Sequence, residues 1–210
     1  MLIYPKELFK YPRNIMSVFI FVMFLLILNN IHPFLAKDDP IQGEILVFEG
    51  WVYNKDNAVS EALSEFERGN YKMIVTVGLE SDNNNDDNST GQNYAESAKN
   101  AFILKGISEQ KIVGVSAPDV QKQKTFSMAL AFKMWLLKSG FNIKKVNVFT
   151  FGVHARKSEV VFKQVLEPGI KVGVIAAKPT HYNPKYWWIT KTGWKWVIYD
   201  LAKYIRARLC

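Results

Sequence analysis

Three polar side chains of this chain follow, or begin shortly after, short apolar segments. Glu49 ends the run ILVFE, His154 follows VFTFGV, and Glu96 lies near the start of the segment YAESAKNAFILKGI. Two carboxylates and an imidazole in one site are the groups that general acid–base catalysis uses most often. We therefore predict that Glu49, Glu96 and His154 converge in a catalytic site, as acids and bases or, for the carboxylates, as ligands of a cation.

Two glycines, a tryptophan, a threonine and two cationic residues accompany these three. A helix that begins directly after a strand presents free backbone N–H groups and a positive dipole end to anions. A phosphate or a carboxylate is thus the kind of group that such positions bind. The predicted ligand-binding residues are Gly50, Trp51, Gly78, Thr125, Arg156 and Lys157.

Each catalytic candidate also has a purely structural interpretation. His154 could cap or pack its turn, and Glu96 could be a first-turn carboxylate that stabilises its helix by roughly a few tenths of a kcal/mol. Glu49 has the weaker alternative, because a strand end that leads into Gly-Trp is not a usual place for a solvated charge.

Short β-rich runs alternate with longer helical segments between residues 42 and 178. This alternation is typical of βαβ units and predicts an α/β fold, a Rossmann-like three-layer sandwich with a mostly parallel five-stranded sheet. The predicted strands are Glu44–Phe48, Lys72–Val77, Lys111–Val115, Val146–Thr150 and Lys171–Ile175. The predicted helices are Asp56–Gly69, Tyr94–Gly106, Gln121–Ser139 and Ala155–Leu166. In such sheets ligands bind outside the carboxyl ends of the strands, where all the candidate residues fall.

Metal chemistry finds little support in the sequence. The three histidines, His32, His154 and His181, are widely separated, and the single cysteine is the last residue, so no zinc pattern can form. The segment Asp82–Asn88 begins like a calcium loop, but Asp87 stands where the sharp turn needs glycine. A solvated insertion is the favoured interpretation of that segment, and no metal is predicted.

Several motifs in order resemble the ElyC/SanA/YdcF family over about residues 44–166. They are ILVFEGWV, VTVG, YAESAKNAFILKGI, KTFSMA and VFTFGVHARKS. The Glu-Gly-Trp and HARKS elements are similar to a branch in which the glycine-rich first loop is replaced. The resemblance implies a role in cell-envelope biogenesis, and it admits S-adenosylmethionine as a ligand, although no cofactor is identified by the residues themselves.

An uncharged apolar segment precedes this domain. Residues 14–36 are long enough to cross a hydrocarbon core of roughly 30 Å as one helix, which predicts a transmembrane anchor. A cleaved signal peptide is the alternative, but Phe34 in the −3 position argues against cleavage after Ala36. Lys6, Lys10 and Arg13 lie before the span, so residues 1–13 should be cytoplasmic and the domain outside, on the inner (plasma) membrane.

The positive charge of the chain is concentrated at its C-terminal end. The formal net charge is +8, and between Lys171 and Cys210 eight basic residues stand against Asp200 alone. Residues 179–210 are also rich in Trp and Tyr, which predicts contact with the membrane and with anionic lipid. Alternatively, Trp194, Val197 and Ile198 belong to a stripe that packs a terminal helix onto the sheet. Nucleic acid is not expected as a partner of an exported domain.

Two functional hypotheses follow from these patterns. The first is an envelope protein that binds or acts on a phosphate-bearing or lipid-linked precursor. The second is a non-catalytic binding module for a nucleotide-like ligand or a partner protein, which the same fold permits. Glu49-Gly50-Trp51 in place of a glycine-rich loop favours the first.

Overall fold

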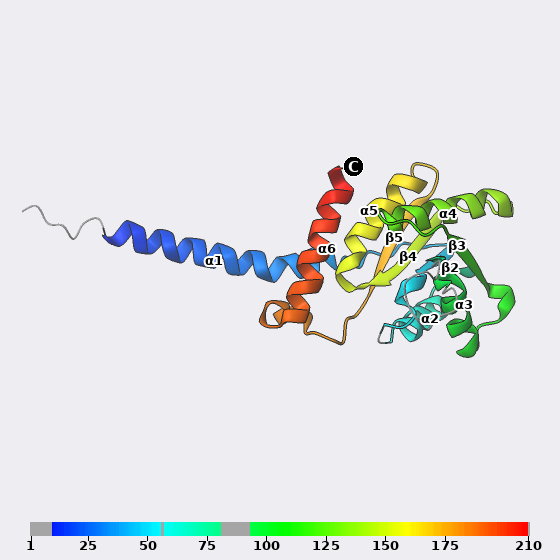
Figure 1. Ribbon diagram of the computed structural model, residues 1–210, viewed down its shortest axis with the longest axis horizontal. Coiled ribbons are helices and arrows are strands. Elements are labelled where there is room, and N and C mark those ends of the chain that lie inside the picture. The colour runs from blue at the N-terminus through cyan, green and yellow to red at the C-terminus, as the bar shows by residue number, and fades with distance from the viewer. Residues whose placement is uncertain (1–9, 56, 81–92, 210) are drawn as a thin grey trace, which may run out of the picture.

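The computed structural model describes residues 10–55, 57–80 and 93–209. A single sheet of five parallel strands forms the centre of the domain, in the order β3-β2-β1-β4-β5 (Figure 1). The strands are β1 (Ile45–Glu49), β2 (Met73–Leu79), β3 (Ile112–Ala117), β4 (Lys145–Phe151) and β5 (Lys171–Ala177). Neighbouring β1 and β4 mark the point where the chain order reverses, which is where ligands bind in open α/β sheets.

Helices cover both faces of the sheet, so the predicted three-layer α/β fold is confirmed. One face carries α2 (Ala58–Arg68) and α3 (Tyr94–Leu104). The other face carries α4 (Lys124–Ser139) and α5 (Ala155–Leu166). The five strands and four helices expected from periodicity all form, with ends that move by a few residues. The sheet is parallel throughout, and a helix lies between each strand and the next strand along the chain, as parallel pairing requires.

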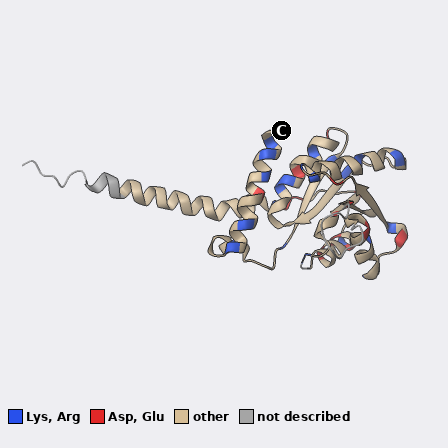
Figure 2. Cartoon of the chain, viewed as in Figure 1, with Lys and Arg blue, Asp and Glu red and all other residues tan. Residues whose placement is uncertain are grey.

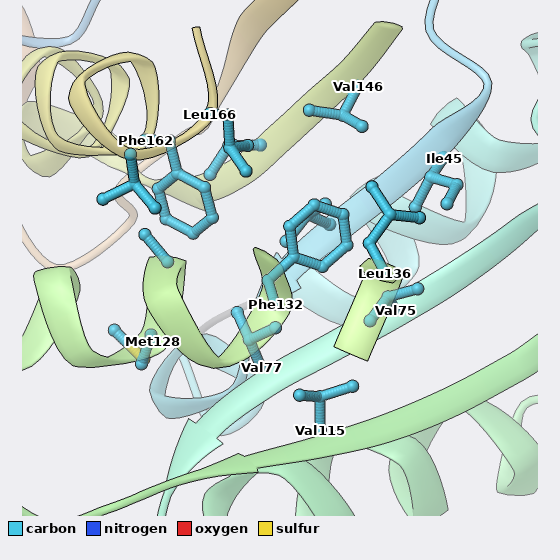
Figure 3. Close-up of a cluster of buried hydrophobic side chains, with 14 of the residues drawn as sticks. Ile45, Val75, Val77, Val115, Met128, Phe132, Leu136, Val146, Phe162 and Leu166 are labelled. Atoms are coloured by element: carbon cyan, nitrogen blue, oxygen red, sulfur yellow. The ribbon is translucent and has the colours of Figure 1, made fainter. Parts of the chain in front are cut away.

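The alternation of side chains along the strands separates two apolar cores. Ile45 and Val47 of β1 point to the face of α4 and α5, where Phe132 and Phe162 meet them (Figure 3). Leu46 and Phe48 point to the opposite face, under α2 and α3. Since successive strand residues alternate between faces, Glu49 must project to the α4 and α5 face.

The N-terminal helix α1 (Lys10–Leu35) projects far from the domain (Figure 1). Its segment Ile15–Leu35 has a mean hydropathy of 2.2 and is long and apolar enough to cross a membrane. This span differs from the predicted one by one residue at each end. Side chains from Ile15 to Ile27 are exposed, as expected of a helix that has lipid rather than protein around it.

The last turns of α1 do pack against the domain. Leu28 and Leu35 are buried with Val153, Trp187 and Val197 in a third apolar cluster. The indole Nε1 of Trp187 donates a hydrogen bond of 3.1 Å to the carbonyl oxygen of Leu28. The domain is therefore fixed directly at the end of the apolar segment of α1 rather than by a loose linker.

A short 3-10 segment, η4 (Pro184–Ile189), and the terminal helix α6 (Lys191–Leu209) build the C-terminal extension. The helix itself was predicted, but the packing of its apolar stripe onto the sheet was wrong. Trp194 and Ile198 are each 41% exposed, whereas Val197 and Asp200 are buried. The reason is local: Gly193 lets α6 approach the backbone of Trp187 closely, and this orients α6 toward α5 and α1.

Candidate functional site

Glu49 ends β1 at the point where the strand order reverses, and its carboxylate is completely buried. Three side chains donate to it: the Trp51 indole at 3.2 Å, the Ser158 hydroxyl at 2.9 Å and the Thr150 hydroxyl through a short contact. Burial of a carboxylate is costly unless such donors satisfy it. Glu49 therefore organises the side chains around it and is not itself open to a ligand.

His154 lies beside Trp51, with ring centroids 5.1 Å apart in an edge-to-face arrangement. It ends the 3-10 turn η3 (Gly152–His154) that follows β4, directly before α5. Its Nδ1 lies 2.7 Å from Oδ1 of Asp200, which comes from α6. Such an imidazole–carboxylate pair fixes the orientation of the ring, which is 5% exposed, and directs Nε2 toward Lys157.

Asp200 is 1% exposed and belongs to the terminal helix. Burial favours its neutral form, but the hydrogen bond to His154 and the charges of Lys203 and Lys157 outweigh burial. The pKa of Asp200 therefore lies below its usual value. The carboxylate is therefore ionised at neutral pH and accepts the hydrogen bond from Nδ1 of His154.

Lys157 continues this chain of contacts. Its Nζ donates to Oγ1 of Thr125 at 2.6 Å and lies 3.5 Å from Nε2 of His154. Burial lowers the pKa of Lys157, Lys203 adds to the effect, and the charges of Glu49 and Asp200 oppose it. Thr125 lies in the first turn of α4, so the N-terminal ends of α4 and α5 both adjoin this ammonium group.

Glu96 does not join this network. Its side chain is 46% exposed, pairs with Lys99 at 3.5 Å on the same helix, and lies over Gly114 of β3. Gly114 is two residues after Ile112 in β3, so both face the same side of the sheet, and Ile112 packs into the core under α2 and α3. Glu96 thus lies on the opposite face of the sheet from Glu49. The predicted convergence of Glu49, Glu96 and His154 in one site is therefore wrong for Glu96.

Gly50 and Gly78 serve close packing rather than an open loop. A β-carbon on either residue would collide with the backbone of Tyr94 or Ala95, at the start of α3. Asn93 caps this helix by accepting from the N–H groups of Ala95 and Glu96. The first turn of α3 therefore lies directly on the ends of β1 and β2.

Arg156 turns away from the site. Its Nε donates to the carbonyl oxygen of Phe34 at 2.8 Å, and its guanidinium lies 4.2 Å from the centre of the Phe34 ring. A cation at the C-terminal end of a helix satisfies free carbonyl groups and the negative dipole end. Arg156 thus fastens α1 to the domain, and Lys157 is the cation that faces the site.

Sequence reasoning missed three members of the network, namely Thr150, Ser158 and Asp200. Thr150 and Ser158 carried a usable signal, since each is a polar residue at a position whose strand or helix neighbours are apolar and buried. Asp200 was visible only as the one acidic residue in a basic segment. Its partner lies 46 residues earlier, and no spacing rule connects the two.

Comparisons of the chain with protein-family models, with curated proteins and with solved structures find no match. Among the residues that the structure describes, no group of three or more His, Cys, Asp or Glu could hold a metal ion. The segment Asp82–Asn88, where a calcium loop was considered, lies outside the described residues.

Chemically, the described network offers the imidazole of His154 held by Asp200, the ammonium group of Lys157 beside the hydroxyl of Thr125, and the buried carboxylate of Glu49 with its own donors. His154 places Nε2, the ring nitrogen that Asp200 does not contact, beside the ammonium group of Lys157. Lys157 can neutralise a developing or permanent negative charge. An acid–base step next to an anionic group is the chemistry that this arrangement suits.

Proposed function

We propose that this chain is a membrane-anchored envelope protein that binds, or acts on, a phosphate-bearing or lipid-linked precursor. In this proposal the domain lies outside the cytoplasm, with Lys6, Lys10 and Arg13 on the inner side of the span. The motif resemblance to the ElyC/SanA/YdcF family supports the envelope role, and the site chemistry supports the phosphate.

One observation carries the lipid-linked part of the proposal: the site lies next to the C-terminal turns of α1. Val153, the neighbour of His154, is buried against the last turns of α1 with Leu28 and Leu35. A substrate whose tail stays in the bilayer therefore needs to raise only its headgroup to reach His154 and Lys157. A soluble nucleotide would gain nothing from this position.

The phosphate is supported by the state of Lys157. Burial and Lys203 lower the pKa of this ammonium group against the opposing charges of Glu49 and Asp200, so a bound anion would further stabilise its charged form. His154 would act as acid, base or phosphate contact, and Glu49 would hold Trp51 and attract Lys157. Binding should consequently raise the pKa of Lys157.

The S-adenosylmethionine alternative is not favoured by the described residues. Tyr94 and Ala95 occupy the space next to Gly50 and Gly78, where a nucleotide loop would need open backbone.

The test is thermal stability of the full chain in nanodiscs with a polyprenyl phosphate, the matching polyprenol or S-adenosylmethionine. A ligand present at 100 times its Kd stabilises the folded state by about 2.7 kcal/mol. We expect the polyprenyl phosphate alone to raise Tm, and Lys157→Gln to abolish the rise. The matched control is Lys163→Gln, which removes the same charge from the same helix at a partly exposed position, where its partner Glu159 keeps Lys37 as a second cation. Equal responses to phosphate and alcohol, or in both variants, would refute the proposal.

A further inference from the structure

The terminal helix α6 has two unlike faces. Its inner face carries Gly193, Val197 and Asp200, all buried against the rest of the protein. Its outer face carries large apolar side chains at helical spacing that remain in solvent: Trp194 at 41%, Ile198 at 41%, Ile205 at 48% and Leu209 at 81% exposure. An apolar face of this size on a soluble surface calls for an apolar partner.

Basic residues flank this apolar face. Lys191, Lys195 and Arg206 are exposed on α6, and Figure 2 shows Lys and Arg residues along the whole helix. The one acidic residue of α6 is Asp200, which is buried and held by His154. The outer face therefore combines apolar and positive groups with no exposed carboxylate of its own helix. This pattern is typical of helices that lie in an anionic membrane interface.

The depth of the anchor places α6 at such an interface. The exposed stretch Ile15–Ile27 of α1 measures about 20 Å at ~1.5 Å per residue. A bilayer core is about 30 Å thick, so Leu28–Leu35 must also lie at or near bilayer depth. These are the turns on which Trp187 and Val197 pack. The segments η4 and α6 consequently reach the headgroup level together with the end of α1.

The direction of α6 agrees with this depth. In Figure 1 α6 lies on the side of the domain from which α1 leaves, and its axis runs across α1 rather than alongside it. A helix that crosses the anchor in this way lies along the bilayer surface when the anchor spans the bilayer. Trp194, Lys195, Ile198, Tyr199 and Ala202 form an open, nearly flat surface on this helix.

We propose that the outer face of α6 lies in the headgroup region of the leaflet where α1 emerges, and that it binds anionic phospholipid there. Apolar side chains such as Ile198 enter the upper acyl region, while Lys191, Lys195 and Arg206 contact lipid phosphates. The same helix carries Asp200 on its inner face, so lipid contact and the position of His154 are mechanically linked. The proposal depends on α1 spanning the membrane, and it stands whether or not the site binds a precursor.

The test places a fluorescent probe on single cysteines in the full chain, in nanodiscs. Cys210 is the only native cysteine, so Cys210→Ser gives a clean background. Ile198→Cys reports on the outer face of α6, and the control Leu137→Cys reports on α4, where Leu137 is 71% exposed. With nitroxide-labelled headgroup lipids we expect the probe at 198 to be quenched several-fold more than the probe at 137. Equal quenching at the two positions would overturn the proposal.

A second experiment tests whether binding requires anionic lipid. Quenching at 198 should increase when phosphatidylglycerol replaces part of the phosphatidylcholine, and a Lys191→Gln, Lys195→Gln, Arg206→Gln triple variant should lose that increase. Indifference to lipid charge would overturn the anionic part. If the probe in detergent became more buried as the protein concentration increased, the partner of this face would be a second copy of the chain. That result would also overturn the proposal. Lys157→Gln leaves this face unchanged, so the proposed function can fail while this result stands.

Discussion

The two halves of the sheet's carboxyl edge each have a glutamate that the sequence placed in the site, but only one of the two glutamates is buried there. In the half formed by β1 and β4, Glu49 is closed over by α5 and receives three donors, while α6 brings Asp200 to His154. In the half formed by β2 and β3, Glu96 stays partly in solvent and pairs only with a neighbour on its own helix, Lys99, among the described contacts. Glu49 thus belongs to a buried network because α5 covers it, whereas the side chain of Glu96 stays 46% exposed.

The largest expected effect lies in the covered half. Glu49→Ala would leave the donors of Trp51, Thr150 and Ser158 without an acceptor and would remove a charge that stabilises the Lys157 ammonium group. Loss of one partner from a buried charged group costs about 3–5 kcal/mol of unfolding free energy. Urea unfolding of the detergent-solubilised full chain measures this.

Glu49→Gln serves as the control for the same position, because its amide oxygen keeps one acceptor and its shape. It should lose less stability than Glu49→Ala. A Glu49→Ala protein within about 1 kcal/mol of the parent would contradict the interpretation of Glu49 as the centre of the network.

The second effect is pH-dependent and concerns Asp200→Asn. The pKa of Asp200 is lowered in the folded state, so its ionised form adds stability that is fully present above the ordinary carboxyl pKa of about 4. That stability is lost as the pH falls through the lower folded-state pKa. Asp200→Asn should therefore cost about 1–3 kcal/mol at neutral pH and progressively less in acid.

Thermal unfolding of the two proteins across the acidic range measures this difference. The control is Asp119→Asn, which breaks a partly exposed contact with Lys124 at 3.5 Å. It should change stability by less than about 0.5 kcal/mol at any pH. A constant difference between the parent and Asp200→Asn from neutral to acidic pH would show that the charge of Asp200 is not what matters.

The same comparison explains why the sequence predicted the fold better than the site. Strands and helices follow from local periodicity, and β1 to β5 all formed near their expected positions. The site depends on which face a side chain takes and on partners far along the chain. Glu96 was placed with Glu49 because both follow strands, but α3 turns Glu96 toward Gly114 on the other face. Asp200 reached His154 because α6 packs by its Gly193 face, which the apolar pattern of α6 did not indicate.

The smallest expected effect is that of Glu96→Ala, and it is the sharpest test of the contrast between the two halves. Its contact with Lys99 is an exposed i,i+3 pair, and such pairs contribute about 0.3–0.5 kcal/mol. The neighbouring Asn93→Ala should cost more, about 1 kcal/mol, because Asn93 caps the helix through two N–H groups. Measured together by urea unfolding, the pair separates a structural cap from a surface charge on the same turn. Stabilisation by polyprenyl phosphate should survive Glu96→Ala unchanged. If Glu96→Ala abolished it as Lys157→Gln is expected to, Glu96 would belong to the ligand site despite its distance from Glu49, and the two halves of the edge would act as one.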